Sequence, residues 1–443
     1  MGDKDKLSLI FSLIKEYIDD KHKSKSWTPG VDWVRYSGPY FSSEEYVSAT
    51  KSLLKEWLVL GEDSIKFENK FPKYFGKSHG ILTNSGSSAN LLMMLALTSK
   101  RLYNLPKGTK VITPVAGFPT TLNPILQVGF EPVFVDIDLE SLNLDLDQTE
   151  KAAAEGARVI TFAHVLGNPP NMDRLMDIVK KYNLILLEDC CDALGSTYDG
   201  KPLGSFGEFA SCSFYPAHHI TMGEGGFVAT KTCAQERIIR SFREWGRGCY
   251  CVGKKANLLK NGMCKKRFNT WLPSLPTEIF DHKYVYEEIG YNLKPIELQA
   301  SIGLAQLKKM DLIDSKRKEN YKRLYGFFKK YEEFFILPEP TAKSDPSWFA
   351  FPITIKDGSP FARKDIVEFF ENSKIQTRTY FAGNILLQPA YTHLMDPREV
   401  IRRFPVARKV TTDTFFLGTS PVITGEQIAY IEQKLHEFMK DFL

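Results

Sequence analysis

Short apolar runs alternate with helical patterns between about residues 75 and 230 of this 443-residue chain. Near-continuous apolar strands separated by helices indicate a largely parallel sheet that helices cover on both faces. The predicted strands are 110–114, 132–136, 158–164, 184–188, 210–215 and 226–230. The predicted helices between them include 88–100 and 172–181. The pattern therefore predicts an α/β fold.

The pattern changes on either side of this region. An apolar run at 7–14, followed by charged positions, predicts an amphipathic N-terminal helix. Residues 245–284 show no clear period and indicate a long structured loop that contains three cysteines. A long helix is predicted over about 295–325, and mixed strand and helix patterns follow after about 335. The expected units are a helical extension, a large cofactor-binding domain and a small α+β domain, over 1–34, 35–325 and 326–443.

Composition excludes several classes of protein. Hydrophobic residues make up 43% and charged residues 25%, values typical of a globular chain and not of a disordered, fibrous or disulfide-stapled one. The net charge of +5 is too weak to argue for nucleic-acid binding. No apolar stretch approaches the ~18 residues needed to cross a bilayer, so no membrane association is expected. Seven cysteines without an export signal favour metal or redox chemistry in a reducing compartment, and we expect a cytoplasmic location.

Two polar segments follow apolar runs. The stretch TNSGSSAN, from Thr83 to Asn90, precedes a helix, where glycine and exposed N–H groups favour phosphate binding. Its polar side chains also suit helix capping, so this segment alone leaves both interpretations open. Asp189 ends an apolar strand, at the sheet edge where α/β proteins bind ligands, and can pair with a protonated ring nitrogen. On its own, a capping role in the next turn explains that acid better.

A third segment, SFYPAHHITMGEGG from Ser213 to Gly226, makes the combination specific. In order and spacing the chain resembles the DegT/DnrJ/EryC/StrS sugar aminotransferase and dehydratase branch of the fold-type-I pyridoxal-phosphate (PLP) enzymes. The resemblance spans about residues 35–440 and includes GPYFSSEE, WLVLGEDSIKFENKF, PVFVDIDLESLNLD, HVLGNPPNMD, GYNLKPIELQASIGLAQL and IQTRTYFAGN. It implies a mostly parallel seven-stranded sheet, a smaller C-terminal domain, and a homodimer whose subunits share the active site.

The resemblance also implies roles for individual residues. Asp189 would keep the pyridinium nitrogen protonated, so that the cofactor ring acts as an electron sink. Phe118, in VAGFPTTLNP, would stack on the ring, and Asp192 would lie near the ring hydroxyl, where many relatives have Gln or His. The residues expected around the cofactor phosphate are Gly86, Ser87, Ser213 and, from a second subunit, Asn292.

His218 is the informative departure from the aminotransferase pattern, which has a lysine at this position that binds the cofactor aldehyde covalently. Imidazole forms no stable bond of that kind, so the cofactor would be held noncovalently and can work as its amine, pyridoxamine phosphate (PMP). Histidine can still transfer protons near neutral pH. A drifted, inactive aminotransferase and a packed core histidine are the alternatives.

Four cysteines have a spacing that suits a metal or iron–sulfur centre. Cys249 and Cys251 are separated by one residue, and Cys191 and Cys264 lie before and after them. Four thiolates can complete a zinc or an iron–sulfur site, although C-x-C is less typical of structural zinc. Cys191 comes two residues after Asp189, so a centre held there would lie beside the cofactor. The remaining cysteines are predicted to be buried and apolar: Cys190, Cys212 and Cys233. A solvated, lysine-rich loop with incidental cysteines is the alternative.

Within the family, histidine in place of lysine together with these cysteines resembles dehydrases that carry a [2Fe–2S] cluster. The resemblance implies dehydration at C3 of CDP-4-keto-6-deoxy-D-glucose, in the formation of 3,6-dideoxyhexoses for surface polysaccharide such as O-antigen. It also implies an NAD(P)H-dependent flavin and iron–sulfur reductase as the electron-donating partner. The gap before Cys264 is longer than in that pattern, which puts this ligand in particular doubt.

Two other functions stay open. A cluster-free dehydratase, acting on GDP-4-keto-6-deoxymannose, also has histidine here and regenerates its amine cofactor from glutamate. A noncatalytic regulator would use the same fold to bind a ligand. Arg378, Arg402 and Arg403 are candidate contacts for the sugar nucleotide, and surface ion pairs explain each of them nearly as well.

Overall fold

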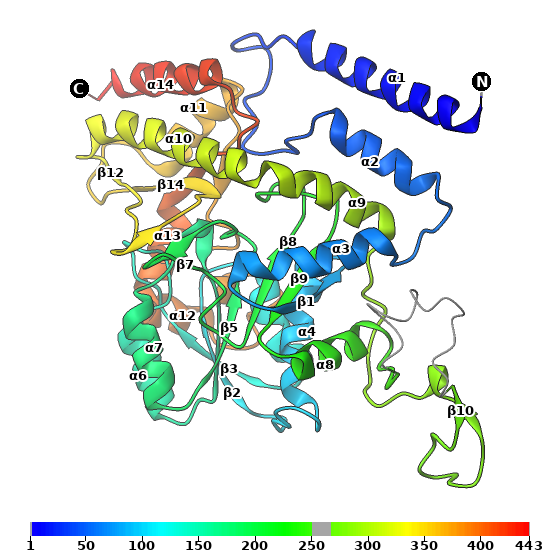
Figure 1. Cartoon of the computed structure of the whole chain (residues 1–443). Helices are drawn as coiled ribbons and strands as arrows, with labels where there is room; N and C mark the ends of the chain where they lie inside the picture. Colours follow the sequence, from blue (N-terminus) through cyan, green and yellow to red (C-terminus); the bar gives the residue numbers. More distant parts are fainter. Residues whose placement is uncertain (1, 250–266, 443) are drawn as a thin grey trace.

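Seven short strands form the central sheet of the molecule (Figure 1). The structure is a computed structural model and describes residues 2–249 and 267–442. In spatial order the strands are β1 (His79–Thr83), β9 (Gly226–Thr230), β8 (Phe209–Ser213), β5 (Ile185–Asp189), β4 (Val159–Ala163), β2 (Lys110–Pro114) and β3 (Glu131–Val135). The strands from β8 to β3 pair in parallel, whereas β9 runs antiparallel to both β1 and β8. The predicted α/β class with a mostly parallel seven-stranded sheet is confirmed.

Helices cover both faces of this sheet, as the near-continuous apolar strands require. Neighbouring residues along a strand point to opposite faces. Ile81 and Leu82 accordingly belong to two different apolar clusters, as do Val111 and Ile112. One cluster includes side chains of α4, α5 and α8, and the other includes side chains of α3, α6, α7 and α9. These helices are α3 (Glu62–Lys70), α4 (Gly86–Thr98), α5 (Pro119–Gln127), α6 (Leu146–Ala154), α7 (Met172–Lys181), α8 (Cys233–Arg243) and α9 (Glu297–Gln306).

A smaller sheet and its helices form a third apolar cluster in the C-terminal part. Its strands, in spatial order, are β12 (Phe335–Ile336), β14 (Ala350–Ile355), β16 (Thr414–Gly418) and β15 (Arg378–Thr379). The helices of this part are α10 (Met310–Phe328), α11 (Arg363–Asn372), α12 (Pro397–Arg403), α13 (Pro405–Asp413) and α14 (Gly425–Met439). Figure 1 shows α10 and α14 side by side above the small sheet, where they contact each other.

The remaining elements lie around these two sheets. At the N-terminus, α1 (Asp3–Lys23) contacts α2 (Ser43–Leu53), and α2 packs on α9. Short strands form a three-stranded sheet, β13 (Ser344–Asp345), β6 (Thr197–Tyr198) and β7 (Lys201–Pro202), and a separate pair, β10 (Phe268–Asn269) and β11 (Phe280–Asp281). Among the described residues, no helix combines the length and the apolar composition needed to cross a membrane.

Two predicted segments differ from the structure, and one strand of the central sheet was not predicted. The helix predicted over 295–325 is instead α9 and α10, separated by a 3-10 turn at Leu307–Lys309. The break lies where the chain changes partners, because α9 packs on α2 and α3 whereas α10 packs on α14 and β14. β1 was absent from the predicted strands, and the described part of the 245–284 loop contains β10 and β11. The other predicted strands and helices of the sheet region agree to within two residues at each end.

A buried arginine joins α8 to α3 and β1. The guanidinium of Arg243 donates to Glu68 Oε1 at 2.9 Å and to the backbone carbonyl of Leu82 at 2.7 Å. Its other nitrogen donates to Glu244 Oε1 at 2.6 Å, and the Arg243 side chain is fully buried. Removing one partner of such a pair leaves an uncompensated buried charge.

We therefore expect Arg243→Met to lower the free energy of unfolding by about 3–5 kcal/mol. Urea unfolding followed by circular dichroism measures this change. Arg408→Met, which replaces an exposed arginine of α13, is the control and should stay within about 0.5 kcal/mol of the parent. Equal effects of the two substitutions would show that the buried network contributes nothing specific.

Candidate active site

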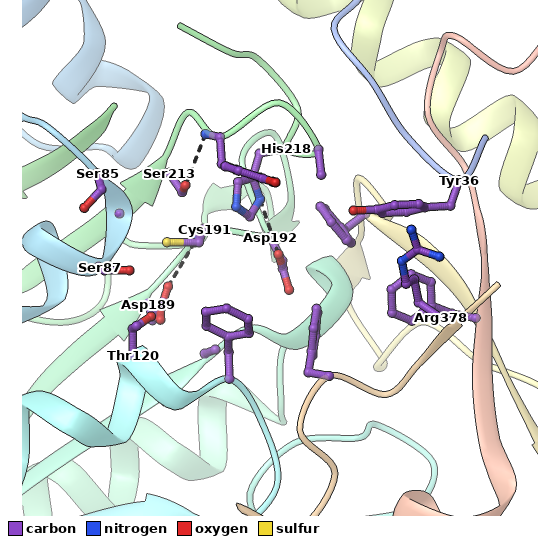
Figure 2. A pocket seen from close by; sticks show the side chains of 18 of the residues that line it. Tyr36, Ser85, Ser87, Thr120, Asp189, Cys191, Asp192, Ser213, His218 and Arg378 are labelled. Carbon is purple, nitrogen blue, oxygen red and sulfur yellow. Dashed lines mark hydrogen bonds and ion pairs between the residues drawn. The ribbon is translucent and has the colours of Figure 1, made fainter. Parts of the chain in front are cut away.

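A cavity of about 540 Å³ lies at the carboxyl ends of the central strands, and residues of both sheets line it. Figure 2 shows the side chains of its wall. The strands β5 and β8 contribute Asp189 and Ser213 at their ends, and the small sheet contributes Arg378 and Phe416. Ligands bind at this edge in open α/β sheets because the loops after the parallel strands converge there.

The start of α4 forms one end of the cavity. Ser85 caps the helix, with its hydroxyl accepting from the Ser88 backbone N–H at 3.1 Å. Gly86 is packed so closely that a Cβ there would lie 2.5 Å from Ser213 Cβ and 3.0 Å from Cys191 Sγ. Ser87 and Ser213 line the same end. Free N–H groups of a helix start, with hydroxyls around them, suit a phosphate.

Asp189 lies below this helix start and accepts hydrogen bonds from four elements. Asn90 of α4 donates to Oδ2 at 2.7 Å, and Thr121 of α5 donates to the same oxygen at 2.8 Å. Ser211 of β8 and the backbone N–H of Cys191 approach Oδ1 at 3.3 and 3.1 Å. The carboxylate is almost fully buried but lines the cavity. These hydrogen bonds fix the carboxylate in an orientation in which it can contact a ligand in the cavity.

Phe118 and Asn292 differ in their placement. The Phe118 ring lines the cavity with half of its surface exposed, and its edge meets Phe381 at 5.9 Å between ring centroids. An exposed aromatic face in that position can stack on a flat ligand. Asn292 is exposed, accepts a hydrogen bond from Lys294 at 2.6 Å, and is not among the described residues that line the cavity of this single chain.

His218 lies in the wall between the two ends of the cavity. Its Nδ1 is 3.4 Å from Asp192 Oδ1, and Asp192 Oδ2 accepts from the backbone N–H of Leu166. The imidazole packs at 5.3 Å between centroids against the Phe349 ring. Asp192 thus faces one ring nitrogen of His218 at ion-pair distance but without a hydrogen bond, and a carboxylate so placed favours the protonated imidazole.

A buried arginine holds the backbone around His218. Arg317 of α10 donates to the carbonyl oxygens of Ala217 and His218 at 3.4 and 3.2 Å, and to that of Phe349 at 2.9 Å. Burial lowers the pKa of Arg317 to about 10. The next residue, His219, points away into the core, where burial lowers the pKa of its imidazole well below the usual value. Of this histidine pair, therefore, His218 lines the cavity.

The predicted cysteine ligands are only partly described. Cys191 lines the cavity beside Gly86, and burial raises the pKa of its thiol well above the usual value. Cys249 is half-buried at the end of the described segment, and Cys251 and Cys264 lie outside the described residues. Cys190 and Cys212 are buried as predicted, but the prediction for Cys233 is wrong. It is exposed because it occupies the first position of α8, on the protein surface.

Another group of potential metal ligands is better explained by packing. His164, Glu188 and Cys190 place one ligand atom each within 4.8 Å of one another, and all three are buried. Glu188 already accepts from His164 at 2.9 Å and from the backbone N–H groups of Gly204 and Gly207 at 2.8 and 2.6 Å. A carboxylate with this many donors is satisfied without a metal.

Sequence reasoning missed the residues that hold the site in place. Asn90, Thr121 and Ser211 fix Asp189, and Arg317 fixes the backbone of His218. Asn90 directly precedes the apolar run LLMMLAL in α4. A polar residue at such a position could have indicated a buried hydrogen-bond network. No comparable signal marks Arg317, because its α10 neighbours include many charged residues.

Comparisons with known proteins agree with this geometry. Residues 39–436 match the DegT/DnrJ/EryC1/StrS aminotransferase family. The chain is 43% identical to the lipopolysaccharide biosynthesis protein RfbH of Salmonella typhimurium, over 97% of both proteins. It is 40% identical to the dTDP-4-dehydro-2,6-dideoxy-D-glucose 3-dehydratase of Saccharopolyspora spinosa, over 97% of this chain and 91% of that protein.

Solved structures give the same result. The GDP-4-keto-6-deoxy-D-mannose 3-dehydratase of E. coli, solved with bound hydrated PLP, matches with a TM-score of 0.76 at 28% identity, over 91% of this chain and 99% of that one. A structure of a GDP-4-keto-6-deoxymannose 3-dehydratase with a trapped PLP–glutamate geminal diamine matches with a TM-score of 0.77 at 28% identity. That match covers 90% of this chain and 99% of the other.

The packing at Gly86 predicts a stability effect. Because a Cβ would overlap Ser213 and press on Cys191, Gly86→Ala should lower the free energy of unfolding by about 1–3 kcal/mol. Gly326→Ala is the matched control within α10, where a Cβ meets no atom within 4 Å, and should stabilise by about 0.5–1 kcal/mol. Urea denaturation of both variants measures the difference. Equal changes in the free energy of unfolding of the two variants would mean that Ser213 and Cys191 can move away from Gly86 at little cost.

Proposed function

We propose, because the chain belongs to the DegT/DnrJ/EryC1/StrS aminotransferase family, that it is a sugar-nucleotide 3-dehydratase working with PMP. The observation that carries the proposal is His218 in the cavity wall, at the position where the aminotransferase pattern has a lysine. Relatives named as 3-dehydratases support the reaction class. Family membership over nearly the whole chain favours an enzyme over the noncatalytic regulator.

The described residues fit such a cofactor. The cradle at Gly86, with Ser87 and the Ser213 hydroxyl beside it, would hold the phosphate. Asp189 would hold the proton of the ring nitrogen, and Phe118 would stack on the ring face. PLP bound in a structural relative supports the cofactor class. When bound, PMP supplies an amine for the sugar ketone and a ring that accepts electron density.

The chain's own residues would then have distinct tasks. His218 would accept and donate a proton inside the cavity through one of its ring nitrogens. Asp192 would orient the imidazole through its Oδ1, which lies 3.4 Å from Nδ1 of His218. Arg317 would keep the His218 backbone from shifting by holding its carbonyl oxygen. The cofactor would remain noncovalent, because no lysine is among the described residues lining the cavity.

The finer proposal is that the substrate is CDP-4-keto-6-deoxy-D-glucose, as in CDP-6-deoxy-L-threo-D-glycero-4-hexulose-3-dehydrase. The 43% identity to a lipopolysaccharide biosynthesis protein supports a role in surface polysaccharide formation. The chain would act as a homodimer, with Asn292 of one subunit completing the phosphate site of the other. Its exposure and its absence from the described lining of its own cavity are compatible with that role.

A [2Fe–2S] cluster held by Cys191, Cys249, Cys251 and Cys264 is the redox half of the proposal. When bound, such a cluster supplies electrons one at a time, here from an NAD(P)H-dependent flavin and iron–sulfur reductase. The support on this chain is the thiol of Cys191, which lines the cavity two residues after Asp189. A sulfur ligand there would place the centre beside the cofactor ring.

The second candidate is a cluster-free dehydratase that regenerates its amine cofactor from glutamate. The observation that favours it is the structural match to a GDP-4-keto-6-deoxymannose 3-dehydratase with a trapped PLP–glutamate adduct. Iron content separates the two candidates, because the cluster-free reaction needs no metal.

Iron and sulfide analysis tests the redox half. Anaerobically purified protein should contain about two irons and two sulfides per chain and absorb in the visible range. Cys191→Ser and Cys249→Ser should each lose most of this iron, whereas Cys233→Ser, at the exposed start of α8, should keep it. Zinc or no metal in the parent protein would favour the cluster-free reaction.

Substitution of His218 tests the dehydration half. Loss of a proton-transferring group slows a reaction by about 10²–10⁴-fold, so His218→Ala should show that loss in single-turnover dehydration. His218→Lys should also be slow and should retain PLP covalently after borohydride reduction. His393→Ala, an exposed histidine outside the described cavity lining, should leave the rate unchanged. Parent-like rates in His218→Ala would contradict the proton-transfer role.

A further inference from the structure

The end of the cavity opposite α4 is built by Arg378 and Tyr36. Arg378 lies on β15, the edge strand of the small sheet, which pairs with β16 through Arg378 and Phe416. Its guanidinium carbon is 4.4 Å from the centroid of the Tyr36 ring, and one nitrogen donates to the Thr377 carbonyl at 2.6 Å. Stacking and this hydrogen bond fix the plane of the guanidinium group.

Tyr36 and the Thr377 carbonyl are the hydrogen-bond partners of Arg378 among the described residues. A guanidinium has five N–H donors, and no carboxylate of the described chain lies within ion-pair distance of this one. Among the described residues that line the cavity, Arg378 is also the one lysine or arginine. Three carboxylates line the same cavity: Asp189, Asp192 and Glu224. A cationic group in a wall whose other charged groups are carboxylates is the place where an anionic part of a ligand gains most.

This pair lies across the cavity from the start of α4. In Figure 2, Ser85, Ser87 and Asp189 lie at one side of the cavity, and Tyr36 and Arg378 lie at the other, with His218 between them. The Tyr36 hydroxyl points into the cavity and is a hydrogen-bond donor at neutral pH, as an ordinary phenol is, and burial raises its pKa further. A ligand reaching from His218 toward solvent would pass this pair.

We propose that Arg378 and Tyr36 form the subsite for the diphosphate of the nucleotide-sugar substrate. The free edge of the guanidinium binds the diphosphate oxygens, and the Tyr36 hydroxyl donates to the same group. This contact sets the sugar in the middle of the cavity, next to His218. The inference rests on the proposed function for the identity of the ligand, and it goes beyond that function by naming the residues that hold the ligand's charge.

The other arginines considered from the sequence do not have this placement. Arg402 and Arg403 are exposed on α12, and neither is among the described residues that line the cavity. The Arg403 guanidinium lies over the ring of Phe404, the residue that follows α12. The structure thus singles out Arg378 from three candidates that the sequence leaves equal.

The experiment uses full-length protein and two readouts, with PMP bound for the dehydration assay and PLP bound for the absorption spectra. The first is binding of CDP alone by calorimetry, and the second is KM and kcat for dehydration of CDP-4-keto-6-deoxy-D-glucose. Loss of a charge-assisted hydrogen bond weakens binding by about 10- to 100-fold, so Arg378→Gln should lose that much CDP affinity and raise KM by a similar factor. Its kcat should change less than threefold, and Arg378→Lys should recover part of the affinity. Arg402→Gln is the matched control and should bind CDP as the parent does.

The outcomes separate this inference from the proposed function. Parent-like CDP binding and KM in Arg378→Gln would overturn it. A variant that binds CDP normally but has lost affinity for L-glutamate, seen as a change in the PLP absorption, would also overturn it and assign Arg378 to a carboxylate. If the parent dehydrates no sugar yet binds CDP through Arg378, the diphosphate subsite stands and the proposed reaction fails. The PLP absorption spectrum of each variant confirms that cofactor loading and folding are intact.

Discussion

The carboxylate of Asp189 is the group on which the geometry of the site depends. Its hydrogen bonds come from α4, α5, β8 and the turn that follows β5. One side chain thus connects two helices, a neighbouring strand and the turn after its own strand. A buried polar group of this kind is costly unless every partner is in place. The same bonds that satisfy Asp189 therefore fix the start of α4 and the entry to α5 relative to the sheet. The network therefore also sets the positions of Gly86 at the start of α4 and of Phe118 at the start of α5.

His218 is positioned by a different route. The loop that carries His218 is not part of the Asp189 network. Its backbone is held by Arg317 of α10, which donates to the His218 carbonyl. Arg317 also binds carbonyl oxygens next to β14, including that of Phe349, whose ring packs against the imidazole. A shift of α10 would therefore move the His218 backbone and the aromatic wall together. The proposed proton-transferring residue is coupled to the packing between the two sheets.

The parts of the fold that the sequence predicted are those with local signals. The inner strands and α7 have continuous or periodic apolar positions, and their bounds agree closely with the structure. β1 was missed because its apolar core is short and it forms only by pairing with β9, far along the chain. At Gly80 of β1 a Cβ would lie 2.3 Å from the Phe227 ring, a constraint that only the paired sheet reveals. The break between α9 and α10 likewise comes from a change of packing partner and not from a Pro or Gly signal.

The site residues divide in the same way. Asp189 ends one strand and His218 follows another, both within recognisable motifs, and in the structure both residues line one cavity. Asn90, Arg317 and Tyr36 act through contacts with residues distant in sequence, so spacing alone could not find them. Cys233 shows the converse error, because a cysteine's burial depends on its place on the helix surface and not on its type.

Backbone packing shapes one end of the cavity, whereas side chains shape the other. This difference bears on how one fold can accept several substrates. The end at α4, where we propose the cofactor binds, depends on close backbone packing, and even one methyl group at Gly86 would collide with its neighbours. The opposite end depends on side chains such as Tyr36, Arg378 and Phe381, on loops and at the edge of the small sheet, which can change without disturbing the central sheet. The relatives' names include both GDP- and dTDP-linked sugars, as this division of the cavity would allow. If the proposed function holds, specificity for the nucleotide sugar would be a property of the small-sheet end, and the chemistry at His218 and Asp189 would stay the same.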